Sequence, residues 1–173
     1  QVTLAQGALL GRALASEPEL RAEFTLDALL QNIIDSSAIE GETLNVGSVR
    51  SSIARRLGLA DSDSAPAEPR AEGLAQIMLD ATTKLDAPLT ESRLLQWHAW
   101  LFAGEDGSLE SFLGRRIRVG DWRGSDAMQV VSGRIDRPTV HFEAPPREGL
   151  EARVAGFVAW FNASRADVTL DPL

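Results

Sequence analysis

The apolar residues of the chain recur mostly at helical spacing. The clearest run places five of them on one helical face: Leu26, Leu29, Leu30, Ile33 and Ile34. Gly41 is expected to end this helix, because glycine readily adopts the left-handed conformation of a C-terminal cap. The segment is therefore predicted to be an amphipathic helix with one buried face.

Further helices are predicted from the same spacing on both sides of this run. They span residues 2–14, 46–57, 71–85, 91–102 and 148–162. Asn45 and Thr90 are expected N-caps, because their side-chain oxygens can accept hydrogen bonds from free backbone amides. The helix over 71–85 is expected to turn four residues inward: Leu74, Ile77, Met78 and Leu85. Asp171 and Pro172 are typical of the start of another helix.

Two short runs break the helical pattern. Residues 128–132 (MQVVS) and 139–142 (TVHF) favour strands, and the six residues from Gly133 to Pro138 suit a hairpin loop. Residues 61–70 (DSDSAPAEPR) are polar and contain proline, which is typical of a loop. The chain is thus predicted to be mainly helical with one β-hairpin.

Composition narrows the possible functions. Apolar residues make up 44% of the chain, enough for a core, and the net charge of −8 disfavours nucleic acid as a partner. Cysteine is absent, and the chain has neither a signal peptide nor an apolar run long enough to cross a membrane, which predicts a cytoplasmic protein. His98 and His141 are far apart in sequence and show no metal-ligand spacing, so no metal site is expected among these residues.

Several conspicuous side chains have plain structural interpretations. His98 is expected to pack within its helix, and Trp160 and Phe161 are expected in the core. A local basic stretch is interpreted as solvated or internally paired, with nucleotide or target contact as the alternative: Arg115, Arg116, Arg118 and Arg123.

Four segments, in this order and spacing, together resemble one protein family. They are SSAIEG at 36–41 followed by a helix, LLQWHAWLF at 94–102, GDWR at 120–123 with MQVVSG at 128–133, and VHFEAPP at 140–146 followed by WFN at 160–162. The set resembles bacterial Fic proteins that carry a small helical domain ahead of the Fic core. The resemblance implies an all-α helical bundle with a β-hairpin flap at 128–142. It also implies an N-terminal helical domain over 1–59, a loop over 60–70, and the first part of the Fic core over 71–173.

The resemblance implies an activity as well. Fic enzymes transfer AMP from ATP to a Ser, Thr or Tyr hydroxyl of a target protein, with Mg²⁺ as cofactor. Their signature loop, H-P-F-x-[DE]-G-N-G-R, is not among the 173 residues, so no catalytic residue is assigned here. The family pattern also allows a homodimer.

Glu40 is the residue to which the resemblance gives a regulatory role. In family members with the S-x-x-x-E-G motif, this glutamate pairs with an arginine of the signature region and holds ATP in an unproductive pose. Ser36 lies one turn before Glu40 on the same helical face, and Gly41 completes the motif. The same glutamate could orient a water that removes AMP from a modified target. The plain alternative is that the motif is only the polar end of an amphipathic helix.

The hairpin is expected to dock the target by adding an extended target segment to a strand edge. The expected contacts are Val130, Val131, Val140 and His141. An ordinary surface hairpin is the structural alternative. Two other functions remain open: a regulatory or binding module without catalysis, and a Fic enzyme that uses another nucleotide or phosphocholine.

Overall fold

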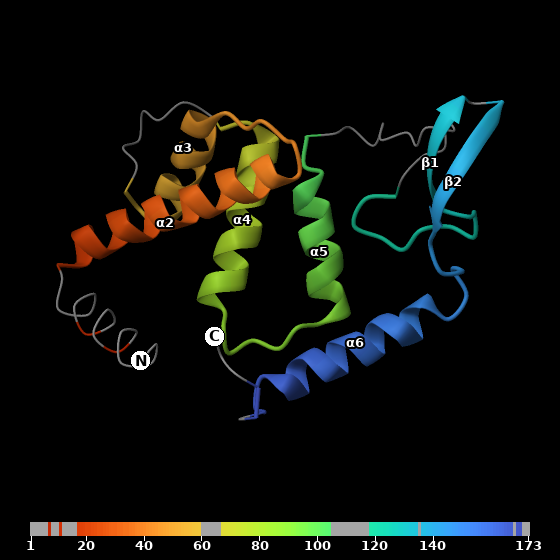
Figure 1. Ribbon diagram of the computed structural model, residues 1–173. Helices are drawn as coiled ribbons and strands as arrows, with labels where there is room; N and C mark the ends of the chain where they lie inside the picture. Colours follow the sequence, from red (N-terminus) through yellow and green to blue (C-terminus); the bar gives the residue numbers. More distant parts are fainter. Residues whose placement is uncertain are drawn as a thin grey trace. The chain divides into compact units, whose positions relative to one another are not determined.

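The computed structural model describes residues 7, 11, 17–59, 67–104, 118–134, 136–167 and 169–170. These residues contain five helices and one antiparallel pair of strands (Figure 1). The chain divides into two compact units, residues 1–85 with 171–173, and residues 86–170. Of the expected helix over 2–14 only Gly7 and Gly11 are described, both in helical conformation, and the helix start at Asp171 lies outside the described residues.

The expected all-α bundle is wrong. Described residues of the second unit include a two-stranded sheet, β1 (Gln129–Arg134) and β2 (Arg137–Glu143), beside the helices. Helices α2, α3 and α4 lie in the first unit, and α5 and α6 lie in the second. The described structure is therefore a mixed arrangement of helices with a small sheet.

Helix α2 (Pro18–Ile39) is the longest described helix of the first unit. Proline is tolerated in its first turn, where a backbone N–H has no helical partner in any case. Its predicted apolar face is confirmed, since Leu26, Leu29 and Ile33 are buried. Leu30 and Ile34 pack against the same core.

Helices α3 (Val46–Arg56) and α4 (Pro69–Thr83) complete this core. The Asn45 side chain accepts a hydrogen bond from the Ser48 amide at 3.1 Å, as predicted for an N-cap. Val49 and Ile53 are fully buried, and the small residues Ala71 and Ala75 allow α4 to approach closely. The prediction that Leu85 faces inward is wrong, because Leu85 follows the end of α4 and its side chain is 64% exposed.

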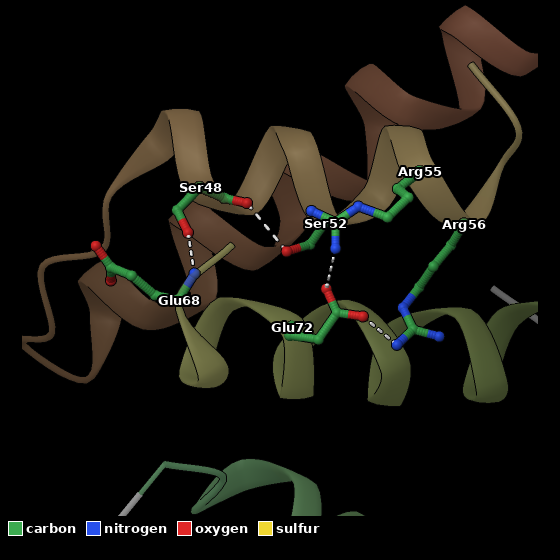
Figure 2. A network of polar contacts seen from close by, with 6 residues as sticks. All are labelled: Ser48, Ser52, Arg55, Arg56, Glu68 and Glu72. Carbon is green, nitrogen blue, oxygen red and sulfur yellow. Dashed lines mark hydrogen bonds and ion pairs between the residues drawn. The ribbon is translucent and has the colours of Figure 1, made fainter. Parts of the chain in front are cut away.

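A polar network joins α3 to the start of α4 (Figure 2). The Ser48 hydroxyl accepts a hydrogen bond from the Glu68 amide at 2.8 Å, and the buried Ser52 hydroxyl donates to the Ser48 carbonyl at 3.0 Å. Glu72 of α4 lies between two arginines of α3. Arg56 binds one carboxylate oxygen directly, and Arg55 Nη1 lies 3.9 Å from the other, within ion-pair range.

Replacing Ser48 by alanine should weaken this junction. The Glu68 amide would lose its acceptor, which typically costs about 1 kcal/mol of unfolding free energy. Urea denaturation followed by circular dichroism measures the loss. Ser51→Ala is the matched control on the same helix. An equal loss in both variants would show that the Ser48 bond has no special role.

In the second unit, polar contacts fix α5 (Glu91–Leu101) against α6 (Leu150–Ser164). The Asn162 side chain accepts a hydrogen bond from the Leu89 amide and donates one to the Leu89 carbonyl, both at 2.9 Å. Arg165 donates to the Ala87 carbonyl at 3.0 Å. Thr90 caps α5 by accepting from the Arg93 amide, as predicted. The short segment before α5 is thereby tied to the end of α6.

Two predictions for the second unit are wrong. Trp160 is 62% exposed and Phe161 is 37% exposed, so the described residues do not bury them in a core. The prediction of a six-residue hairpin loop is also wrong, because Gly133 and Pro138 pair with each other within the two strands. Both residues are common in turns, but here they belong to the strand ends.

Within the described parts of the chain, none of the helices combines the length and the hydropathy that crossing a membrane requires.

Candidate functional site

The end of α2 carries the first group of predicted site residues. Glu40 is the C-cap, and Gly41 adopts φ +77°. The Gly41 amide donates to the Ala38 carbonyl at 3.0 Å, and the Glu42 amide donates to the Ser37 carbonyl at 2.8 Å. These two bonds form a Schellman motif, which satisfies the last carbonyls of the helix through backbone groups alone.

Ser36 and Glu40 are both exposed on α2, one turn apart. The Ser36 carbonyl accepts the Glu40 amide at 3.4 Å. Within the described residues of the first unit, the Glu40 carboxylate forms no hydrogen bond or ion pair. The side chain is thus available to bind a cation, and the helix cap does not use it.

The residues after Gly41 hold this turn in place. Glu42 pairs with Arg70 of α4 at 3.1 Å, and Leu44 packs against the core of the first unit. Asn45 then caps α3 and lies 3.5 Å from the Glu68 carboxylate. The exposed Glu40 therefore stands on a turn fixed from both α3 and α4.

The second group of predicted site residues lies on the hairpin. Val130 and Val140 are 58% and 48% exposed, His141 is exposed, and Val131 is half-buried. The His141 Nε2 atom lies 2.6 Å from the Ser132 hydroxyl. The structure places these four residues together on the hairpin, whereas Ser36, Glu40 and Gly41 belong to the other unit.

The GDWR segment anchors the base of the hairpin. The Gly120 amide donates to His98 Nδ1 of α5 at 2.9 Å, and the Trp122 indole donates to Glu91 at 2.8 Å. Arg123 donates to the Pro145 and Asp126 carbonyls on either side of the strands. His98 is therefore a packed helix residue, as predicted, and it accepts a backbone hydrogen bond as well.

Arg147 is the anchoring residue that the sequence reasoning missed. Its Nε donates to the Arg123 carbonyl at 2.9 Å, and its guanidinium lies 5.2 Å from the centre of the Trp122 ring. It also binds Glu151 four residues later on α6. That i, i+4 spacing of opposite charges was the available sequence signal.

Arg118 and Arg123 both make internal contacts. Arg118 lies 3.9 Å from Asp121, and Arg123 donates to the two carbonyls described above. This agrees with the structural interpretation of the basic stretch. Arg115 and Arg116 lie outside the described residues.

The family resemblance implies ATP and Mg²⁺ as cofactors. Among the described residues, no group of three or more histidine, aspartate or glutamate side chains could hold a metal ion. What the described residues do offer is an exposed carboxylate on a fixed turn, and a hairpin on a fixed base.

Comparison with known proteins identifies similarity in the first part of the chain. Residues 1–59 match a family described as a domain of unknown function (DUF4172). The matched range includes α2 and α3 with Ser36, Glu40 and Gly41, and it ends before α4 and the hairpin. No curated protein matches the chain.

Gly120→Ala should loosen the base of the hairpin. Gly120 adopts φ +69°, and an added Cβ would lie 2.9 Å from the Ala99 Cβ on α5. We expect a loss of about 2 kcal/mol in unfolding free energy, measured by thermal denaturation. Gly124→Ala is the control, because nothing lies within 4 Å of a Cβ there. Equal stability of both variants would contradict the close approach of Gly120 to α5.

The Arg147–Glu151 pair should make the hairpin base sensitive to acid. The hydrogen bond from Arg147 holds the pKa of Glu151 below its ordinary value of 4.5, and the same bond raises the pKa of Arg147. Because the folded-state pKa of Glu151 is the lower one, its stabilisation is complete above pH 4.5 and is lost as the pH falls through that lowered pKa. The NMR resonances of the Arg147 Nη2 protons, which face Glu151, should shift in this window. Glu151→Gln should abolish the shift, and persistence of the shift would assign it to another group.

Proposed function

We propose that this chain is the regulatory and target-docking part of a Fic-type protein adenylyltransferase. The full-length protein would transfer AMP from ATP, with Mg²⁺, to a Ser, Thr or Tyr hydroxyl of a target protein, and it would act in the cytoplasm. The ordered resemblance of the four sequence segments supports the family. The observation that carries the docking role is the exposed hairpin on its anchored base.

The hairpin suits target docking for a simple physical reason. It has only two described strands, so each strand has one neighbour and leaves an outer edge of backbone donors and acceptors. An extended protein segment can bind such an edge through main-chain hydrogen bonds, which depend little on side-chain sequence. The anchored base limits the entropy that docking would cost.

Glu40 suits a restraining role in the same protein. Its carboxylate is exposed, and the Schellman turn beneath it is fixed by Glu42, Arg70 and Leu44. Because the backbone of the turn is already fixed, only the Glu40 side chain has to be ordered when it forms a bidentate pair with an arginine. The proposed restraint is that such a pair occupies an arginine that ATP would otherwise use. Removal of AMP from modified targets is an additional proposed activity of the same glutamate.

A binding or regulatory module without catalysis is the second candidate. It is consistent with the 173 residues, among which the signature loop H-P-F-x-[DE]-G-N-G-R is not found. Reading the gene downstream of Leu173 separates the two candidates. An H-P-F-x-[DE]-G-N-G-R segment there supports the enzyme, and its absence supports the binding module. The added mass on a modified target would distinguish AMP from another nucleotide or from phosphocholine.

Glu40→Gly in the full-length protein should increase AMP transfer. Release of the restraint lets ATP bind in a productive pose, and a misplacement on the order of 1 Å can cost about 100-fold in rate. Autoadenylylation with labelled ATP measures the change. Asp35→Asn, which removes another exposed charge from α2, should leave the rate unchanged. If Glu40→Gly has the wild-type rate, Glu40 does not restrain the enzyme.

A further inference from the structure

The two outer edges of the hairpin are not equivalent. In an antiparallel pair of strands, directly opposed residues alternate between two kinds of pair. In one kind, the backbone groups of the two residues form hydrogen bonds with each other, and in the next kind they point outward to the free edges. At the base, the Ala144 amide donates to the Met128 carbonyl at 2.8 Å, so this pair faces inward. The next pair, Gln129 with Glu143, therefore points its backbone groups outward.

Counting from the tip gives a consistent pattern. Arg134 and Arg137 are paired where the two strands join, so their backbone groups face inward. The pairs then alternate towards the base, so three residues along each strand Val131 and Val140 form an outward pair. Along β1, the outward positions thus include Gln129 and Val131.

The outer edge of β2 is interrupted twice. Pro138 pairs with Gly133 and has no amide hydrogen, so it removes one donor from this edge. A Cβ built on Gly133 would lie 3.5 Å from the Arg137 carbonyl oxygen and 3.9 Å from the Thr139 nitrogen. The backbone groups on either side of Pro138 therefore point towards β1, and those of Pro138 itself point outward. His141 is the second interruption. Val130 pairs with Phe142 and Val131 pairs with Val140, which leaves His141 as an extra residue in a bulge.

The outer edge of β1 has neither interruption. Gln129 and Val131 are not prolines, and the extra residue of the bulge lies on β2. Prolines and bulges are the devices by which natural sheets block unwanted strand addition. We propose that the outer edge of β1, and not that of β2, binds an extended segment of a partner protein. This inference rests on the proposed docking role of the hairpin, and it narrows the expected contacts to the β1 side.

The charges at the tip indicate what the bound segment carries. Arg134, Asp136 and Arg137 lie there, and Asp136 pairs with Arg134 at 2.9 Å. Among the described residues of the second unit, no carboxylate pairs with Arg137. An acidic side chain at the tip end of the segment would complement this charge. Antiparallel pairing is the more stable geometry, so the acidic end would be the N-terminal end of the bound segment.

The experiment uses the chain with labelled backbone amides and a synthetic peptide. The peptide has two N-terminal aspartates followed by alternating threonine and valine, and a second peptide has the aspartates at its C-terminus. Residue-resolved hydrogen exchange by NMR should show slower exchange of the Gln129 and Val131 amides when the first peptide is in excess. The second peptide should bind about threefold more weakly, the size expected for one exposed ion pair.

Two proline variants provide the matched comparison. Gln129 and Glu143 are directly opposed, and the Gln129 side chain donates to Glu143 at 2.6 Å, so either substitution loses that same contact. Gln129→Pro removes an outward donor of β1 and should weaken peptide binding about fivefold. Glu143→Pro removes an outward donor of β2 and should bind as the wild type does. Val131→Pro repeats the β1 test at a second position, and circular dichroism checks that each variant folds.

Each outcome decides the edge assignment. Slower exchange at Val140 and Glu143, equal weakening by both opposed prolines, or no binding of either peptide would overturn it. Equal affinity of the two peptides would overturn the proposed direction of the bound segment. The proposed enzyme function fails separately, if the full-length protein does not transfer AMP although the peptide still protects β1. The edge assignment fails alone if AMP transfer occurs while the protection falls on β2.

Discussion

The paired hydrogen bonds between Asn162 and Leu89 are the constraint on which the second unit most depends. Neither α5 nor α6 contains a buried residue, and Leu89 is the buried apolar residue among those described in this unit. Hydrophobic burial therefore contributes little to the relation between these helices within the described residues. Polar side chains that bind backbone groups take its place, and such bonds specify direction and distance more narrowly than apolar contact does.

The first unit is built in the opposite way. Its helices share a core of leucine, isoleucine, valine and alanine, and polar contacts lie around that core. Asp27 pairs with Arg50 between α2 and α3, and the pairs Arg56–Glu72 and Arg70–Glu42 link α4 to its neighbours. Partly exposed pairs of this kind add modest stability. Their main effect is to fix how the three helices meet, and hence where the turn after α2 lies.

The sequence predicts the positions of helices and strands better than it predicts which of their faces are buried. Helical spacing identified the buried face of α2, and the side chains of Asn45 and Thr90 identified two helix starts, because both signals are local. Spacing shows which residues share a face but not whether anything covers that face, so Trp160 and Phe161 were wrongly placed in a core. The β-prone residues predict the hairpin, but glycine and proline also predict a loop from Gly133 to Pro138, whereas both residues lie within strands. The bond from Asn162 to Leu89 joins residues 73 positions apart, a separation at which a single sequence carries no local signal.

The Schellman turn after α2 has a consequence for which substitutions the protein can tolerate. Backbone atoms close the turn, and glycine at position 41 supplies its left-handed conformation. The side chain at position 40 therefore has no part in ending the helix. Substitutions there should cost little folding free energy, whereas a substitution at position 41 must place a side chain at φ +77°. Adjacent residues of one short motif thus contribute to folding in different ways, one through its backbone alone and the other through the absence of a side chain.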